Sequence, residues 1–116
     1  MTEKELADPG DQPFYFQQHG WNRLQLKDVN GEFWFRKLTE NGLTLQVFIE
    51  LTPGGRRKFY VEDPPDEFRA AAHDGRCLTS RGVADGENIF RVHFKKRPES
   101  IADGVWSLRE MLRGNA

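Results

Sequence analysis

The sequence contains one cysteine, no excess of either charge and no long hydrophobic run. Cys77 is the only thiol among 116 residues, so the chain can form neither an internal disulfide nor a thiolate zinc site. The formal net charge of -1 argues against a protein that binds nucleic acid or anionic lipid through its overall charge. No apolar stretch approaches the roughly 20 residues of a membrane-spanning helix, and the acidic start lacks the apolar core of a secretory signal. We therefore expect a cytoplasmic protein with no membrane partner.

The sequence also lacks the patterns of common catalytic and cofactor sites. Its three histidines have no metal-ligand spacing, and neither a Gly-x-Ser-x-Gly elbow nor a suitably spaced pair of carboxylates occurs. The segment 54–58, Gly-Gly-Arg-Arg-Lys, has the composition of a phosphate cradle. It opens a strand, however, whereas anion sites prefer a helix N-terminus, so we interpret it as an exposed hairpin tip. The sequence predicts no catalytic residue, no metal and no cofactor.

Turn-forming dipeptides divide the chain into strands. We expect residues 1–12 to be a flexible leader and residues 13–116 to form a single α+β domain. Asn30-Gly31 and Asn41-Gly42 each separate β-rich runs, and each can supply the positive φ angles of a two-residue hairpin. Together with the turn at 53–55 they predict four antiparallel strands, at 22–29, 32–40, 43–51 and 57–62.

Two helices and a fifth strand complete the predicted fold. The expected elements are a short helix from Asp63 to Gly75, a loop over 77–86, a strand over 89–96 and a helix capped by Ser100 and Asp103. The last helix is amphipathic, and its apolar stripe comprises Ile101, Val105, Leu108 and Leu112. The predicted fold class is α+β, a mainly antiparallel five-stranded sheet in the order ββββαβα with both helices packed on one face.

The hairpin at Asn41-Gly42 determines which side chains share a face of the sheet. Counting back from it places Leu38 opposite Leu45 and Trp34 opposite Ile49, and we expect this aliphatic face to form the core under the helices. The opposite face is then aromatic and partly basic. This aromatic face is predicted to carry Phe33, Phe35, Phe48, Tyr60, Arg91, His93 and Lys95.

Three explanations of the aromatic face remain open. The segment 13–16 could fold back and cover it, or the core could lie on this face. It could instead bind a protein partner or a second copy of the chain, because large apolar patches seldom stay exposed on a monomer. Finally, its rings could stack unpaired bases while the cations hold phosphates. Because the chain is net acidic, we favour a non-enzymatic binding or regulatory domain for protein or self association, with single-stranded nucleic acid as the alternative.

Two segments resemble a part of a known enzyme family. GENIFRVHF at 86–94 and RPESIADGV at 97–105 are similar to the closing strand and helix of aminotransferases that use pyridoxal phosphate. The resemblance implies that the arginine matching Arg91 would hold a substrate carboxylate. It extends over 86–113 only, and 116 residues leave no room for the large domain that carries the cofactor lysine. We interpret it as a shared strand-to-helix arrangement.

Overall fold

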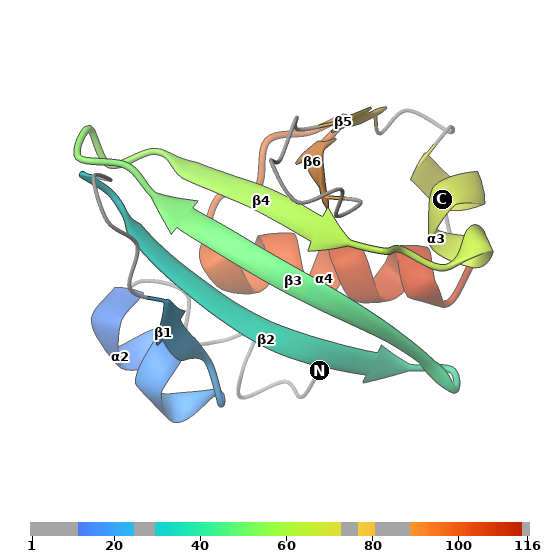
Figure 1. Cartoon of the computed structure of the whole chain (residues 1–116), viewed down its shortest axis with the longest axis horizontal. Helices are drawn as coiled ribbons and strands as arrows, with labels where there is room; N and C mark the ends of the chain where they lie inside the picture. Colours follow the sequence, from blue (N-terminus) through green and yellow to red (C-terminus); the bar gives the residue numbers. More distant parts are fainter. Residues whose placement is uncertain (1–11, 25–29, 73–76, 81–88, 115–116) are drawn as a thin grey trace.

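The protein is an α+β domain built on one antiparallel sheet (Figure 1). The computed structural model describes residues 12–24, 30–72, 77–80 and 89–114. The strands pair in the order β1-β2-β3-β4-β6-β5. They are β1 (Asn22–Leu24), β2 (Glu32–Glu40), β3 (Leu43–Leu51), β4 (Arg57–Glu62), β5 (Cys77–Ser80) and β6 (Ile89–His93). The helices are α2 (Gln12–Gln18), α3 (Asp66–Ala72) and α4 (Ile101–Leu112). The predicted fold class is confirmed, and the described chain adds β5 and α2 to the expected elements.

The hairpin between β2 and β3 forms as the sequence predicts. Asn41 and Gly42 adopt φ angles of 55° and 75°, which is the left-handed region that a two-residue turn of this kind requires. Leu38 then lies opposite Leu45, and Trp34 lies opposite Ile49. Beyond the next turn, Phe59 of β4 lies opposite Ile49. The aliphatic side chains therefore share one face of the sheet.

The predicted two-residue hairpin at Asn30-Gly31 is wrong. It would place Asp28 opposite Phe33, whereas the structure places Leu24 there. This shift is four residues, an even number, so Leu24 still shares a face with Phe33. Gly31 has no positive φ angle. A Cβ at Gly31 would lie 2.8 Å from the carbonyl oxygen of Leu51, so the glycine serves a close backbone approach and not a turn.

The N-terminal helix α2 was not expected. It begins at Gln12, the last residue of the predicted leader, whose other residues lie outside the described part of the chain. Tyr15 and Phe16 are buried, and the Phe16 ring stacks on Trp34 with the centroids 4.6 Å apart and the planes 9° apart. A helix of seven residues is too short for its apolar period to stand out in the sequence.

Two boundaries near the C-terminal half also differ from expectation. Cys77–Ser80, within the predicted loop 77–86, forms the edge strand β5, where Leu78 lies opposite Val92. The strand predicted over 89–96 ends at His93. Residues 73–76 and 81–88 lie outside the described residues. They include the end of the predicted first helix and most of the predicted loop, so neither expectation is tested there.

The core lies between the aliphatic face of the sheet and α4, which runs behind β3 and β4 in Figure 1. Ser100 caps the N-terminus of the helix, and its side-chain oxygen accepts a hydrogen bond of 3.0 Å from the backbone N–H of Asp103. The expected stripe is fully buried, as are the sheet residues beneath it: Ile101, Val105, Leu108, Leu112, Leu38, Leu45, Val47 and Ile49. Each such side chain stabilises the fold by about 1.5–3 kcal/mol relative to an exposed one. The predicted core face is confirmed.

An ionic cluster attaches the end of α4 to the end of β2. Arg113 Nε lies 2.8 Å from Glu40 Oε1, and Arg109 Nη1 lies 3.1 Å from Glu40 Oε2. Arg109 Nη1 also donates to the carbonyl oxygen of Thr39. The hydrogen bond from Arg113, followed by that from Arg109, lowers the pKa of Glu40 against the opposing effect of burial.

Candidate functional site

Four predicted site residues form a row across the sheet. Phe35 lies opposite Phe48, Phe48 lies opposite Tyr60, and Tyr60 lies opposite Arg91. Directly opposed residues of antiparallel strands project to the same face. The row therefore runs over β2, β3, β4 and β6, with aromatic rings at one end and a guanidinium at the other.

The members of this row differ in accessibility. Phe35 and Phe48 are half-buried, and their ring centroids lie 6.1 Å apart. Phe33, two residues before Phe35 on the same face of β2, is also half-buried. Tyr60 is only 2% exposed, and its hydroxyl donates a hydrogen bond of 2.9 Å to Glu50 Oε1. The accessible aromatic surface therefore belongs to the three phenylalanines of β2 and β3, while Tyr60 holds Glu50 in place.

The N-terminal aromatic segment packs on the opposite side of the sheet. Phe16 stacks on Trp34, which lies opposite the buried Ile49, and Tyr15 belongs to the same core. The side chains of residues 12–14 are not described. Tyr15 and Phe16 thus do not cover the phenylalanines, contrary to the first of the three explanations.

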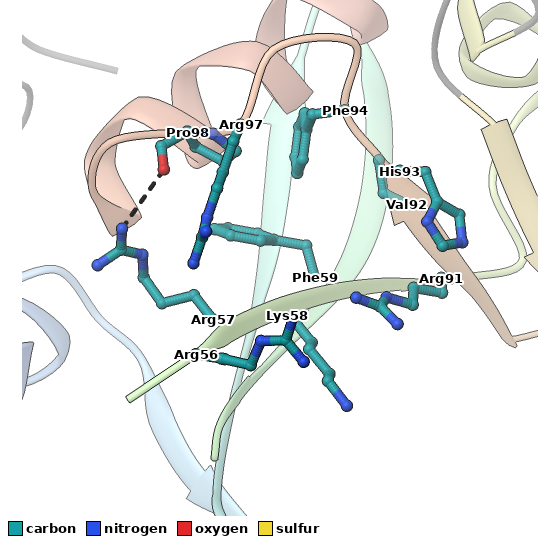
Figure 2. A pocket seen from close by; sticks show the side chains of 10 residues that line it. All are labelled: Arg56, Arg57, Lys58, Phe59, Arg91, Val92, His93, Phe94, Arg97 and Pro98. Atoms are coloured by element: carbon teal, nitrogen blue, oxygen red, sulfur yellow. Dashed lines mark hydrogen bonds between the residues drawn. The ribbon is translucent and has the colours of Figure 1, made fainter. Parts of the chain in front are cut away.

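A cleft of about 260 Å³ adjoins the Arg91 end of the row (Figure 2). Its lining contains five arginine and lysine side chains, one histidine and no carboxylate. We call it the basic cleft; its residues are Arg56, Arg57, Lys58, Phe59, Arg91, Val92, His93, Phe94, Arg97 and Pro98.

The cleft exists because β6 is shorter than β4. β6 pairs with β4 from Phe59 to Glu62 only, so the first residues of β4 extend past its end. At Phe94 the chain leaves the sheet and turns towards α4, and the Phe94 ring packs edge to face on Phe59 at 5.2 Å. Arg57 Nη2 donates to the carbonyl oxygens of Pro98 at 3.4 Å and Glu99 at 3.0 Å, which ties β4 to this connection.

No cation of the basic cleft forms a salt bridge within the described part of the chain, although Glu50 of β3 lies opposite Lys58. The salt bridges found there lie between β1 and β2 and at the end of α4, and none involves a cation of the cleft. Like charges held close together repel one another, and a bound anion removes that repulsion. The cleft therefore has the electrostatics of an anion site with an apolar floor.

The structure brings together some predicted site residues and separates others. Arg91 and His93 line the basic cleft, whereas Lys95 is exposed beyond the end of β6 and lines a different hollow with Lys96. Sequence reasoning missed four cations as site residues, which are Arg56, Arg57, Lys58 and Arg97. The run at 54–58 was the available signal, and its interpretation as a hairpin tip was incomplete.

Other kinds of site find no support among the described residues. No group of three or more His, Cys, Asp or Glu side chains is placed to hold a metal ion in that part of the chain. None of the described helices is long and apolar enough to cross a membrane. Comparison with protein-family models, with curated proteins and with solved structures finds no match for this chain.

Proposed function

We propose that the protein is a non-enzymatic domain that binds single-stranded nucleic acid on its aromatic face and in the adjoining basic cleft. The observation that supports this is the row from Phe35 and Phe48 to Arg91, which places half-buried rings and a guanidinium of the basic cleft on one face. Aromatic side chains stack unpaired bases with about 1–3 kcal/mol per base, and adjacent cations hold the phosphates.

The local charge outweighs the net charge in choosing between the two binding hypotheses. The net charge of -1 argued against nucleic acid, but a ligand responds to the field where it binds, and the cleft gathers five Arg and Lys side chains without a carboxylate. The central part of a protein interface is, by contrast, depleted of charged residues. Protein or self association through Phe33, Phe35 and Phe48 is the second candidate, because Tyr15 and Phe16 leave these rings uncovered.

The test is fluorescence anisotropy with a labelled short oligothymidylate over a range of salt concentrations. We expect binding that weakens as salt rises. Replacing Lys58 and Arg91 together by alanine should lower the affinity and reduce the salt slope by about 0.7 for each lost phosphate contact. Phe48→Ala should weaken binding without changing that slope, because it removes stacking alone. Arg23→Ala is the matched control, since this exposed arginine lies opposite Trp34 and thus on the other face.

The solution mass of the same variants separates the two candidates. A dimer that Phe48→Ala dissociates, together with no oligonucleotide binding by the parent protein, would replace nucleic-acid binding by self association. If the parent protein is monomeric and binds no oligonucleotide near physiological salt, the proposal fails as well.

A further inference from the structure

We infer that the basic cleft is a site for a phosphate monoester dianion, which in the proposed function is the terminal phosphate of a single strand. This inference rests on the proposed function only for the identity of the molecule that carries the phosphate.

The first argument is the convergence of charge from three segments. Arg57 and Lys58 come from the start of β4 and Arg56 directly precedes it. Arg91 and His93 come from β6, and Arg97 comes from the connection to α4. Figure 2 shows Arg57 and Arg97 towards the α4 side of the cleft and Arg91 and His93 towards β6. A continuous nucleic-acid backbone is followed by cations arranged along a groove, whereas cations gathered around one hollow suit a single compact anion.

The second argument is the amount of charge. A phosphodiester carries one negative charge, but a phosphate monoester carries about 1.5 to 2 at pH 7 and offers three terminal oxygens. Arg57, Arg91 and Arg97 line this cleft of about 260 Å³ from three segments, and their combined charge is better compensated by the monoester. Arginine is also suited to this ligand, because its planar fork matches two phosphate oxygens at once.

The third argument is preorganisation. Both hydrogen bonds that Arg57 makes to the 98–99 backbone come from Nη2, and within the described part of the chain neither Nε nor Nη1 donates to any group. The guanidinium is therefore held in place while its remaining donors are not used by the fold. A site that is already ordered loses less entropy when the anion binds.

The fourth argument is size and position. The cleft is slightly smaller than the roughly 300–1,000 Å³ of sites for small organic ligands, so it suits a phosphate with part of its sugar against the half-buried ring of Phe94. β6 lies two strands from β3, which is about 10 Å at the usual strand spacing. Arg91 lines the cleft and shares a face with Phe48, so a strand with its terminal phosphate in the cleft can pass Arg91 and direct its following bases towards that ring.

The experiment compares oligothymidylates of one length that carry a 5′-phosphate, a 3′-phosphate or hydroxyls at both ends, each labelled on an internal base. We expect one of the two phosphorylated strands to bind the full-length protein about tenfold more tightly than the hydroxyl strand. Arg97→Ala should remove this preference, because it should weaken binding of the phosphorylated strand more than binding of the hydroxyl strand. Arg97 is exposed and makes no hydrogen bond or salt bridge among the described residues, so we expect the variant to fold.

Lys95→Ala is the matched control, because Lys95 is an exposed cation two residues away that does not line the basic cleft. It should keep the preference for the phosphorylated strand. Equal loss of the preference in both variants would show a general charge effect and overturn the inference.

Two further outcomes distinguish this inference from the proposed function. Equal affinity of the parent protein for all three strands overturns the phosphate site and leaves nucleic-acid binding intact. If no strand binds, the proposed function fails, and calorimetric titration with inorganic phosphate then decides the site alone. Binding that Arg97→Ala abolishes supports the phosphate site in that case, and absence of binding overturns it.

Discussion

Replacing Gly104 by alanine should destabilise the protein although it improves helix propensity. Gly104 lies inside α4, and a Cβ at this position would be 2.7 Å from Cε2 and 3.0 Å from Cε1 of Phe59. Phe59 is 2% exposed, so its ring has little space to retreat. Overpacking of this kind costs about 1–3 kcal/mol, and we expect the upper end because the contact is with a buried ring. Alanine recovers about 1 kcal/mol of helix propensity, which leaves a net loss of about 2 kcal/mol.

Urea unfolding followed by tryptophan fluorescence measures this loss as a lower midpoint with an unchanged slope. The control is the same substitution in a Phe59→Leu background, where the ring is absent and Gly104→Ala should be neutral or stabilising. The double-mutant cycle should then give a coupling of more than about 1 kcal/mol. Because Phe59 also forms the floor of the basic cleft, Gly104→Ala should weaken phosphate binding as well. An equal loss of stability in both backgrounds would refute the steric argument.

Three further predictions concern the core, a turn and an ionic cluster. Leu108→Ala should lower the free energy of unfolding by about 2–5 kcal/mol in urea titrations, since Leu108 is fully buried in α4; a loss below about 1 kcal/mol would show that the helix is an appendage. Gly42→Val should lower the free energy of unfolding by at least about 1 kcal/mol, because Gly42 has a φ of 75° that valine adopts only with strain. The space around Gly42 is open, so this strain lies in the backbone alone. An unchanged free energy of unfolding would contradict the register of β2 and β3. Glu40 has a lowered pKa, so its contribution to stability is fully present above the ordinary glutamate pKa of 4.5 and is lost as the pH falls through the lower pKa of the folded state. Urea midpoints across the acid range should therefore change less for Glu40→Gln than for the parent protein, and identical pH profiles would contradict the role of Arg113.

The two Asn-Gly dipeptides show what local sequence can and cannot predict. Asn41-Gly42 forms the expected turn, and the register counted from it places Leu38 opposite Leu45 as predicted. Asn30-Gly31 has the same chemistry, but Leu24 and not Asp28 lies opposite Phe33. The alternation of side chains was still predicted because an even shift preserves the face. Face assignment is therefore more robust than register, since it depends on parity alone.

The elements that sequence reasoning missed are those that depend on a partner elsewhere in the chain. β5 has only four residues, which is too short for a strand pattern to be recognised in the sequence. It is defined by its pairing with β6. α2 is held by aromatic packing. The ring centroids of Phe16 and Trp21 lie 5.5 Å apart, and the Phe16 ring stacks on Trp34. Such contacts exist only after the sheet has formed, so no window along the sequence contains them.

The basic cleft was not predicted because it depends on where one strand ends. Had β6 continued to Lys96 as expected, the observed register of β4 and β6 would place Phe94 opposite Arg57 and Lys95 opposite Arg56. The strand would then occupy the space of the cleft, and its backbone would use the edge of β4 that is now open. Instead Phe94 turns onto Phe59 in the core, and Arg57 bonds to the carbonyl oxygens that precede α4. The same alternation of apolar and basic residues that predicted a longer strand thus supplies Arg91 and His93 to the cleft, and the packing of Phe94 on Phe59 favours the shorter strand.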